Sequence, residues 1–317
     1  MGIQSFSAAS IPRRAISFAK RELLMAAFRR AVKATPPMPL DLTATGQMHA
    51  LTGRNGVFEV VAAFKSLYRF ASVRHPLIVH DDGSLAEQHI EFLQTHLPGT
   101  VVIRRADADR RILPVLRAAG FARLEQLRER LVFALKLIDL QVYAEGRPAL
   151  YLDGDILFHQ PPDLLFAMLD NAIDPWVDRY NEDVVSSYAW DPESVQRETG
   201  VELRPRINAG LVCLRRADYR NDFELFERCL ALETPPELFY YVEQTLNAIG
   251  LSRSGAQPLP QQYDVCFRDT FRGEYDHWLR TAEDGHIVTS QHYCGGWLQR
   301  QHYYQHFIEH VAPTLRG

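Results

Sequence analysis

Strand-like and helix-like segments alternate through the first half of the chain, and this alternation is what most constrains its fold. Apolar runs typical of strands lie at 40–45, 76–80, 100–103 and from Ala149 onward, and helical spacing covers 57–71, 85–97 and roughly 109–145. Strands that alternate with helices form mainly parallel sheets with right-handed crossovers. The sequence therefore predicts an α/β protein with a mainly parallel central sheet flanked by helices.

Carboxylates follow two of these predicted strands. Asp81 and Asp82 follow one strand, and Asp153-Gly154-Asp155 follows another. In such sheets ligands bind beyond the carboxyl ends of the strands. If the strand continues, Asp153 and Asp155 share a face about 6–7 Å apart, which suits one divalent cation. Gly154 would let a ligand approach the backbone. Asp-Gly-Asp is also an ordinary turn, so its position at the strand end is what favours a site.

Bulk composition fits a soluble globular protein. Of 317 residues, 46% are hydrophobic and 23% are charged, and a net charge of −4 argues against a general nucleic-acid binder. Four cysteines stand far apart without a C-x-x-C pair, which favours reduced thiols in a cytoplasmic protein and leaves a disulfide as the alternative. No apolar run approaches the roughly 18 residues of a membrane span.

Positive charge is concentrated at the start of the chain. Residues 1–40 hold seven basic residues against Glu22 alone, a charge of +6, so the remainder carries −10. Residues 13–33 resemble a basic helix, and a proline-rich run at 36–39 separates this helix from the rest of the chain. We expect residues 1–39 to be a helix and lead-in to a domain at 40–317. The helix either packs on that domain or lies peripherally on an anionic membrane, here the inner membrane surface.

The second half of the chain is less regular. Strands are expected at 184–190, 207–214 and 287–289, helices at 218–232, 237–249 and 298–311, and a loop at 258–272. His302, His306 and His310 recur at i, i+4 spacing on the last helix. They form either a metal-binding face or an ordinary helix surface.

Several short motifs, taken in order, resemble one known family. They are Tyr151-Leu152-Asp153-Gly154-Asp155-Ile156-Leu157, Ile207-Asn208-Ala209-Gly210-Leu211, Glu243-Gln244-Thr245-Leu246-Asn247, Leu259-Pro260-Gln261-Gln262-Tyr263-Asp264 and His292-Tyr293-Cys294-Gly295, with Lys136 on the helix before the first. They resemble YLDxD, F-N-[AS]-G-V, D-Q-x-x-L-N, L-P-x-x-Y-N and H-x-x-G of the retaining nucleotide-sugar glycosyltransferases of the GT-A fold, closest to glycosyltransferase family 8. The resemblance spans roughly residues 40–300.

The resemblance implies a single GT-A domain and a metal-dependent enzyme. Such an enzyme moves a hexose from a nucleoside-diphosphate sugar, here expected to be a UDP-sugar, to a glycan, glycolipid or other acceptor with retention of configuration. Asp153, Asp155 and His292 would hold Mn²⁺ or Mg²⁺, which neutralises charge on the diphosphate leaving group. Mixed oxygen and imidazole ligands favour Mn²⁺.

The resemblance also assigns substrate contacts. Glu243 and Gln244 would be the catalytic residues beneath the donor sugar. Residues implied to contact the donor are Lys136, Asp153, Gly154, Asn208, Ala209, Gly210 and Gly295. The nucleotide base is expected beside the loop at Thr43, Ala44 and Thr45, with Asp81 near the ribose.

One departure from the family pattern concerns the diphosphate. Family members often end in Lys-Pro-Trp, whereas here Gly296-Trp297 keeps the Trp and lacks Lys and Pro. Arg300 could supply the missing cation only if the next helix begins close by. This keeps open a non-catalytic nucleotide-sugar-binding protein on the same fold. A phosphatase of the haloacid dehalogenase type is disfavoured, because Leu157 stands where those enzymes usually carry Thr or Val.

Overall fold

A seven-stranded sheet runs through the centre of the computed structural model, which describes residues 13–265, 288–294 and 296–316. Its strands are β1 (Gln47–Thr52), β2 (Leu77–Asp81), β3 (Val101–Ile103), β4 (Ala149–Leu152), β6 (Arg179–Glu182), β7 (Ile207–Leu214) and β8 (Gln257–Pro258), in the order β3-β2-β1-β4-β7-β6-β8. The first four in that order are mutually parallel, and β7 is antiparallel to both β4 and β6. The predicted mainly parallel α/β fold is therefore confirmed.

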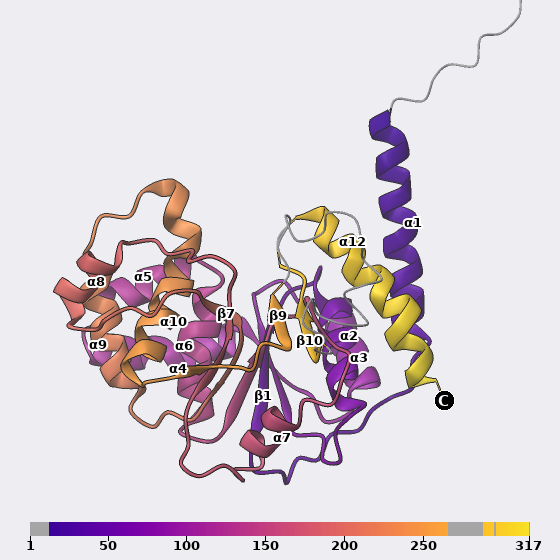
Figure 1. The fold of residues 1–317 in the computed structure, drawn as a ribbon, viewed down its shortest axis with the longest axis horizontal. Coiled ribbons are helices and arrows are strands. Elements are labelled where there is room, and N and C mark those ends of the chain that lie inside the picture. Colours follow the sequence, from indigo (N-terminus) through magenta and orange to yellow (C-terminus); the bar gives the residue numbers. More distant parts are fainter. Residues whose placement is uncertain (1–12, 266–287, 295, 317) are drawn as a thin grey trace, which may run out of the picture.

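Helices cover both faces of this sheet (Figure 1). One face carries α2 (Val57–Tyr68), α3 (Glu87–His96) and α12 (Trp297–His306), and the other α4 (Arg105–Ala118), α5 (Ala122–Arg130), α6 (Ala134–Ala144), α8 (Pro192–Thr199), α9 (Tyr219–Cys229) and α10 (Val242–Arg253). Strand β4 has apolar side chains on both faces of the sheet, and helices bury both sets. Leu150 and Leu152 pack into one apolar cluster and Ala149 and Tyr151 into the other, as the two-residue period of a strand requires.

A second, three-stranded sheet lies at the carboxyl end of β4. It joins β5 (Ile156–Phe158), β10 (Ser290–His292) and β9 (Tyr263–Val265). Strand β10 runs antiparallel to β5, and their register pairs His292 with Ile156. This pairing brings a residue from the end of the chain next to Asp155. Shorter elements are α7 (Asp163–Leu169), the 3₁₀ helices η1 (Pro236–Tyr241) and η3 (Ala312–Leu315), and a π-helical turn η2 (Phe307–Val311).

Several of the predicted elements were misplaced. Residues 40–45 form a turn, and the first strand is β1 at Gln47–Thr52. The prediction missed this strand because it contains buried polar residues. One of them is His49, whose Nδ1 lies 3.0 Å from His80 Nε2 on β2. Residues 184–190 form no strand, and the nearest one, β6, ends at Glu182. The strand predicted at 287–289 lies at Ser290–His292 as β10, and residue 287 is outside the described residues. The long helix predicted at 109–145 is three helices. The predicted loop at 258–272 includes the short strand β9, and its part from 266 onward lies outside the described residues.

Helix α1 (Arg13–Lys33) packs on the domain through its second half. Phe28 and Val32 are buried in the same apolar cluster as α2 and α12, and α1 lies alongside α12 (Figure 1). Just beyond α1, the ammonium of Lys65 on α2 lies 2.8 Å from Thr35 Oγ1, 2.5 Å from the Pro36 carbonyl oxygen and 2.9 Å from His96 Nδ1. Lys65 is fully buried and fastens the end of this helix to the sheet domain.

Replacing this buried lysine should change the pH dependence of stability. Lys65→Met is expected to lower the free energy of unfolding by about 2–4 kcal/mol, because buried carbonyl acceptors lose their donor. Burial lowers the pKa of Lys65 from 10.5 to about 8. The folded chain therefore holds this proton less tightly than the unfolded chain, and the Lys65 contribution to stability grows as pH rises from 8 to 10.5. Urea titrations of both proteins across this range test this; a difference independent of pH would contradict it.

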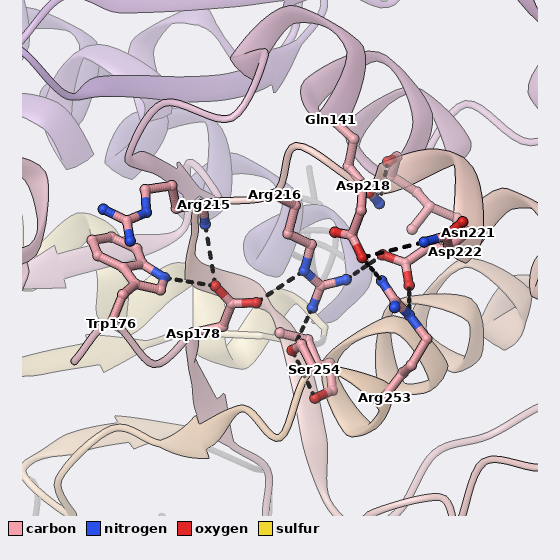
Figure 2. Close-up of polar contacts among 12 residues, drawn as sticks. Gln141, Trp176, Asp178, Arg215, Arg216, Asp218, Asn221, Asp222, Arg253 and Ser254 are labelled. Atoms are coloured by element: carbon pink, nitrogen blue, oxygen red, sulfur yellow. Dashed lines mark hydrogen bonds and ion pairs between the residues drawn. The ribbon is translucent and has the colours of Figure 1, made fainter. Parts of the chain in front are cut away.

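A buried ionic network fixes α9 and α10 to the antiparallel part of the sheet (Figure 2). Arg216, directly after β7, lies 2.9 Å from Asp178 through Nε and 2.9 Å from Ser254 Oγ through Nη2, and it also pairs with Asp222 on α9. Arg253, at the end of α10, bonds the other oxygen of Asp222. Each buried charge in this network therefore has a partner, which is what burial of ions requires. The network holds α10 against the strand that carries Asn208 and Gly210.

Candidate active site

Three candidate metal ligands meet at the carboxyl end of β4. The ligand atoms of Asp153, Asp155 and His292 all lie within 4.8 Å of one another. His292 Nε2 is 3.1 Å from Asp155 Oδ1 and 4.0 Å from Asp153 Oδ2. Tyr151 donates its hydroxyl to Asp153 Oδ1 at 2.6 Å, and the backbone N–H of Tyr293 donates to the Asp155 carbonyl. The two aspartates lie in the turn between β4 and β5, and the pairing of β5 with β10 brings the imidazole to them.

Gly210 on β7 leaves the space in which these groups meet. A Cβ at this position would lie 2.3 Å from His292 Cε1 and 2.8 Å from Asp153 Oδ2, which is closer than atoms can pack. The backbone carbonyl of Gly210 also accepts the N–H of Asp153 at 2.7 Å. His292 Nδ1 is buried with no hydrogen-bond partner among the described residues, so packing against Gly210 and contact with Asp155 orient the ring. Two carboxylates, one imidazole and a gap beside them fit a divalent cation.

Lys136 on α6 lies between two carboxylates of the site. Its Nζ is 3.5 Å from Asp153 Oδ2 and 3.5 Å from Glu243 Oε2. Burial opposes its charge, but Asp153 and Glu243 together raise the pKa of Lys136. Burial raises the pKa of Glu243 to about 7, and Asp153 adds to this while Lys136 opposes it. The pKa of Glu243 therefore lies above its usual value because burial outweighs the opposing charge of Lys136.

Asn208 and Gln244 are fixed by hydrogen bonds at the edge of the same space. Asn208 donates through Nδ2 to Asp183 at 2.9 Å and accepts the N–H of Gly210 at 2.9 Å. Gln244 donates through Nε2 to the Ser187 carbonyl at 3.1 Å. That bond uses the amide nitrogen of Gln244 and not its amide oxygen.

Other walls of the site come from α2 and α12. Glu59 in the first turn of α2 accepts the Tyr304 hydroxyl at 2.8 Å, and its carbonyl accepts the Tyr303 hydroxyl at 2.9 Å. Burial raises the pKa of Glu59. Arg300, one turn into α12, lies beside them, and no ion pair is found for its guanidinium within the described ranges. Helix α12 begins directly after Gly296, so the condition for Arg300 to approach the site is met.

Together these groups line one cavity of about 500 Å³. It contains Lys136, Asp153, Gly154, Asp155, Asn208, Gly210, Glu243, Gln244 and His292 from the predicted set. It also contains Asn55, Gly56, Glu59, Tyr240, Tyr303 and Tyr304, which were not predicted. Asn55 and Gly56 come just after β1, so a correct placement of that strand would have found them. The tyrosines had no sequence signal, because aromatic residues are as common in cores as in sites.

Some predicted residues do not reach this cavity. Thr43, Ala44 and Thr45 precede β1 at its amino end, where the next residue, Gly46, packs against Leu169 of α7. They were assigned to the nucleotide because the first strand was placed too early. Asp81 accepts the backbone N–H groups of Gly83 and Leu85 and so stabilises the turn after β2.

The remaining predicted residues lie elsewhere or outside the description. Asn208 and Gly210 line the cavity, so Ala209 between them points to the other face of β7. There it lines a separate small cavity together with Leu140. Gly295 lies outside the described residues. His302 and His306 on α12 and His310 on η2 form no metal cluster in the part of the chain that the structure describes, and His306 pairs with the Tyr293 hydroxyl.

Comparisons with known proteins bear on the fold. No protein-family model and no curated protein sequence matches the chain. Mouse xyloside xylosyltransferase 1, in its apo form, is similar in structure with a TM-score of 0.50 and 15% identity, covering 83% of this chain and 99% of that one. The glycosyltransferase GlyE of Streptococcus pneumoniae gives 0.52 and 13%, covering 86% of this chain and 62% of GlyE. The chain has the GT-A fold.

A further similar structure is the bifunctional glycosyltransferase WbbM, with a TM-score of 0.51 and 11% identity, covering 86% of this chain and 51% of WbbM. This chain therefore spans less than two thirds of GlyE and WbbM. At such identities the likeness establishes the fold alone. The closer resemblance to glycosyltransferase family 8 remains a prediction from the sequence motifs.

Proposed function

We propose that this GT-A protein is a metal-dependent glycosyltransferase that moves a hexose from a nucleoside-diphosphate sugar, with UDP as the expected nucleotide, to a sugar-bearing acceptor. The observation that carries this proposal is the meeting of Asp153, Asp155 and His292 in a cavity that also holds two cationic side chains. A nucleoside diphosphate is an anionic leaving group, and cleavage of its bond to the sugar adds negative charge. A site with a cation and two basic residues suits that charge.

The metal and the two basic residues would share this task. Asp153, Asp155 and His292 would hold Mn²⁺ in preference to Mg²⁺, and a bound cation neutralises charge on the departing diphosphate. Arg300 supports the diphosphate in place of the missing Lys-Pro-Trp lysine. Lys136, held between Asp153 and Glu243, is placed to bond donor oxygens next to the metal.

The remaining polar residues would bind the sugar and the nucleoside. Glu243 and Gln244 lie at the start of α10, where they can bond the hydroxyls of the donor sugar beneath its reacting face. Retention of configuration is part of the proposal, carried by the sequence resemblance. The nucleoside is assigned to the loop after β1, at Asn55 and Gly56, because ligands bind at the carboxyl ends of parallel strands.

Turnover of a panel of nucleotide sugars with and without Mn²⁺ tests the function directly. We expect metal-stimulated release of the nucleoside diphosphate from at least one UDP-sugar, slowly to water and faster to an acceptor. Binding of a nucleotide sugar without any turnover, with or without acceptors, would instead support the non-catalytic binder. No binding and no turnover of any nucleotide sugar would contradict both.

Arg300 provides a prediction about donor affinity. Arg300→Gln is expected to raise the dissociation constant for the nucleoside diphosphate about tenfold, because one charge-assisted hydrogen bond to phosphate is lost. Isothermal titration in the presence of Mn²⁺ measures this. Arg110→Gln, which removes an exposed arginine on α4, is the matched control and should leave the affinity unchanged. Equal affinity of both variants and the wild type would remove Arg300 from the donor site.

Membrane association through residues 13–33 in a cytoplasmic protein remains part of the proposal, supported by the charge of +6 over residues 1–40. In the described part of the chain, no helix is long and apolar enough to cross a bilayer. Flotation with anionic vesicles measures the association. Recovery in the lipid fraction that is the same with and without residues 1–40 would show that the helix is only structural.

A further inference from the structure

An apolar segment at one side of the cavity is only partly buried. The 3₁₀ helix η1 carries Leu238-Phe239-Tyr240-Tyr241, four large apolar or aromatic residues in succession, and none of its residues is buried. Tyr240 is 62% exposed. Leu238, Phe239 and Tyr241 are half-buried against the second apolar cluster, so Tyr240 is the side chain of this segment that is left mainly in contact with solvent. Burial of such a side chain by a bound molecule is favourable.

Two neighbouring segments add to this surface. Val132, Val184 and Val185 are 40%, 41% and 50% exposed, among the few large hydrophobic residues that the described chain exposes. Each segment adjoins a residue that lines the cavity: Val132 precedes Phe133, and Val184-Val185 come directly after Asp183. We call Val132, Val184, Val185 and Tyr240 the apolar rim. In three separate segments, an exposed apolar side chain thus lines the cavity or follows or precedes a lining residue in the sequence, and the backbone N–H groups of Val184 and Val185 donate to the lining residue Asp183.

Aromatic rings connect the apolar rim to the catalytic residues. The ring of Tyr240 meets the edge of Phe133 with centroids 5.3 Å apart, and Tyr241 with centroids 5.5 Å apart. Lys136 Nζ lies 5.7 Å from the Phe133 ring centroid. Tyr240, Tyr241 and Phe133 therefore form an aromatic wall that runs from the solvent to Lys136.

The position of this wall assigns it to the acceptor. The proposed donor occupies the metal, Arg300 and the loop after β1, with its sugar near Lys136 and Glu243. The acceptor oxygen must form its bond to the anomeric carbon as the bond from that carbon to the phosphate oxygen breaks. The nucleoside diphosphate keeps the electron pair and takes up the hydroxyl proton. Space for the attacking molecule therefore lies next to Glu243 and Gln244, where Tyr240 and Tyr241 stand on the preceding helix.

We propose that the acceptor is an amphiphilic glycoside whose sugar lies against Tyr240 and Tyr241 and whose apolar aglycone covers the apolar rim. This inference rests on the proposed function. Aromatic faces pack well against the C–H groups of a sugar ring, but three exposed valines offer nothing to a fully hydroxylated molecule. An alkyl or aryl aglycone packed on the apolar rim would remove its own apolar surface and that of the apolar rim from water.

Matched acceptors test the inference. The donor found by the nucleotide-sugar panel is used with Mn²⁺ and either methyl or octyl β-D-glucopyranosides and β-D-galactopyranosides, the octyl compounds below their micellar concentration. We expect kcat/KM for an accepted octyl glycoside to exceed that for its methyl counterpart about thirtyfold, because the chain buries apolar surface on the enzyme.

Variants of the apolar rim locate the effect. The double change Val184→Ser/Val185→Ser should reduce the octyl preference at least fivefold while hydrolysis of the donor without acceptor stays unchanged, and Tyr240→Ser should reduce it further. Val101→Ser, which changes an equally exposed valine on β3, is the control and should keep the preference.

The possible outcomes separate this inference from the function on which it rests. Equal use of both glycosides, transfer to neither despite donor hydrolysis, or a preference that survives in the variants of the apolar rim would overturn the acceptor assignment alone. Failure to hydrolyse any nucleotide sugar would overturn the proposed function as well.

Discussion

Asp155→Asn is expected to reduce metal-dependent turnover of the nucleotide sugar by about a thousandfold. The substitution keeps the shape of the side chain and removes its charge, at an oxygen that lies 3.1 Å from His292 Nε2. A cation that neutralises a departing diphosphate contributes several kcal/mol to the transition state, and loss of an anionic ligand weakens its binding. Initial rates over a range of Mn²⁺ concentrations measure the effect.

Asp82→Asn is the matched control for this prediction. Asp82 also comes after a parallel strand, but its carboxylate accepts bonds from the N–H and hydroxyl of Ser84 and lies outside the cavity. Its activity should equal that of the wild type. Strand β4 ends at Leu152, so Asp153-Gly154-Asp155 is a turn before β5 and not the continued strand considered from the sequence. If Asp155→Asn keeps full Mn²⁺-dependent activity, this turn is not a metal site.

Gly210→Ala is expected to weaken Mn²⁺ binding by at least about a hundredfold without removing any polar group. The added methyl would stand 2.3 Å from His292 Cε1 and 2.8 Å from Asp153 Oδ2, so the imidazole and the carboxylate must move apart. Metal ligands tolerate displacements of only about 0.2 Å. The electron paramagnetic resonance signal of free Mn²⁺ measures this affinity without an assay of activity.

Gly296→Ala supplies the comparison for the added methyl. Gly296 has φ of −82°, and the nearest atom to a Cβ there is Gln299 Oε1 at 3.8 Å, so alanine fits. This variant should bind Mn²⁺ as the wild type does. Thermal unfolding of both variants verifies that they are folded. A folded Gly210→Ala protein with unchanged Mn²⁺ affinity would show that the metal does not bind between Asp153 and His292.

The strands that could be predicted are those whose residues are apolar. Ile207–Leu214 was placed correctly because all eight of its residues are buried and most are apolar. Strand β1 was missed because the polar residues Gln47 and His49 are buried within it and interrupt its apolar pattern. Their partners, Tyr143 on α6 and His80 on β2, are far away in the sequence. Because of this misplaced strand, the residues expected beside the nucleotide base, Thr43 to Thr45, lie at the amino end of β1.

The candidate site was predicted where short motifs carry it and missed where the fold assembles it. Asp153, Asp155 and His292 were named from the sequence, but only the pairing of β5 with β10 brings the last of them within 3.1 Å of Asp155. Asp81 and Asp155 look alike as carboxylates at strand ends. Their surroundings separate them, since Asp81 accepts backbone N–H groups of its own turn and Asp155 faces an imidazole. Tyr240 and Arg300 reach the cavity through helices whose packing no local pattern specifies.

Calorimetric titration of the wild-type protein with UDP, with and without Mn²⁺, tests the central claim most directly. The claim is that Asp153, Asp155 and His292 bind a divalent cation together with a nucleoside diphosphate. We predict one site per chain with micromolar affinity when Mn²⁺ is present and at least tenfold weaker binding when the metal is chelated. UDP and GDP that both fail to bind, or that bind equally with and without Mn²⁺, would contradict it.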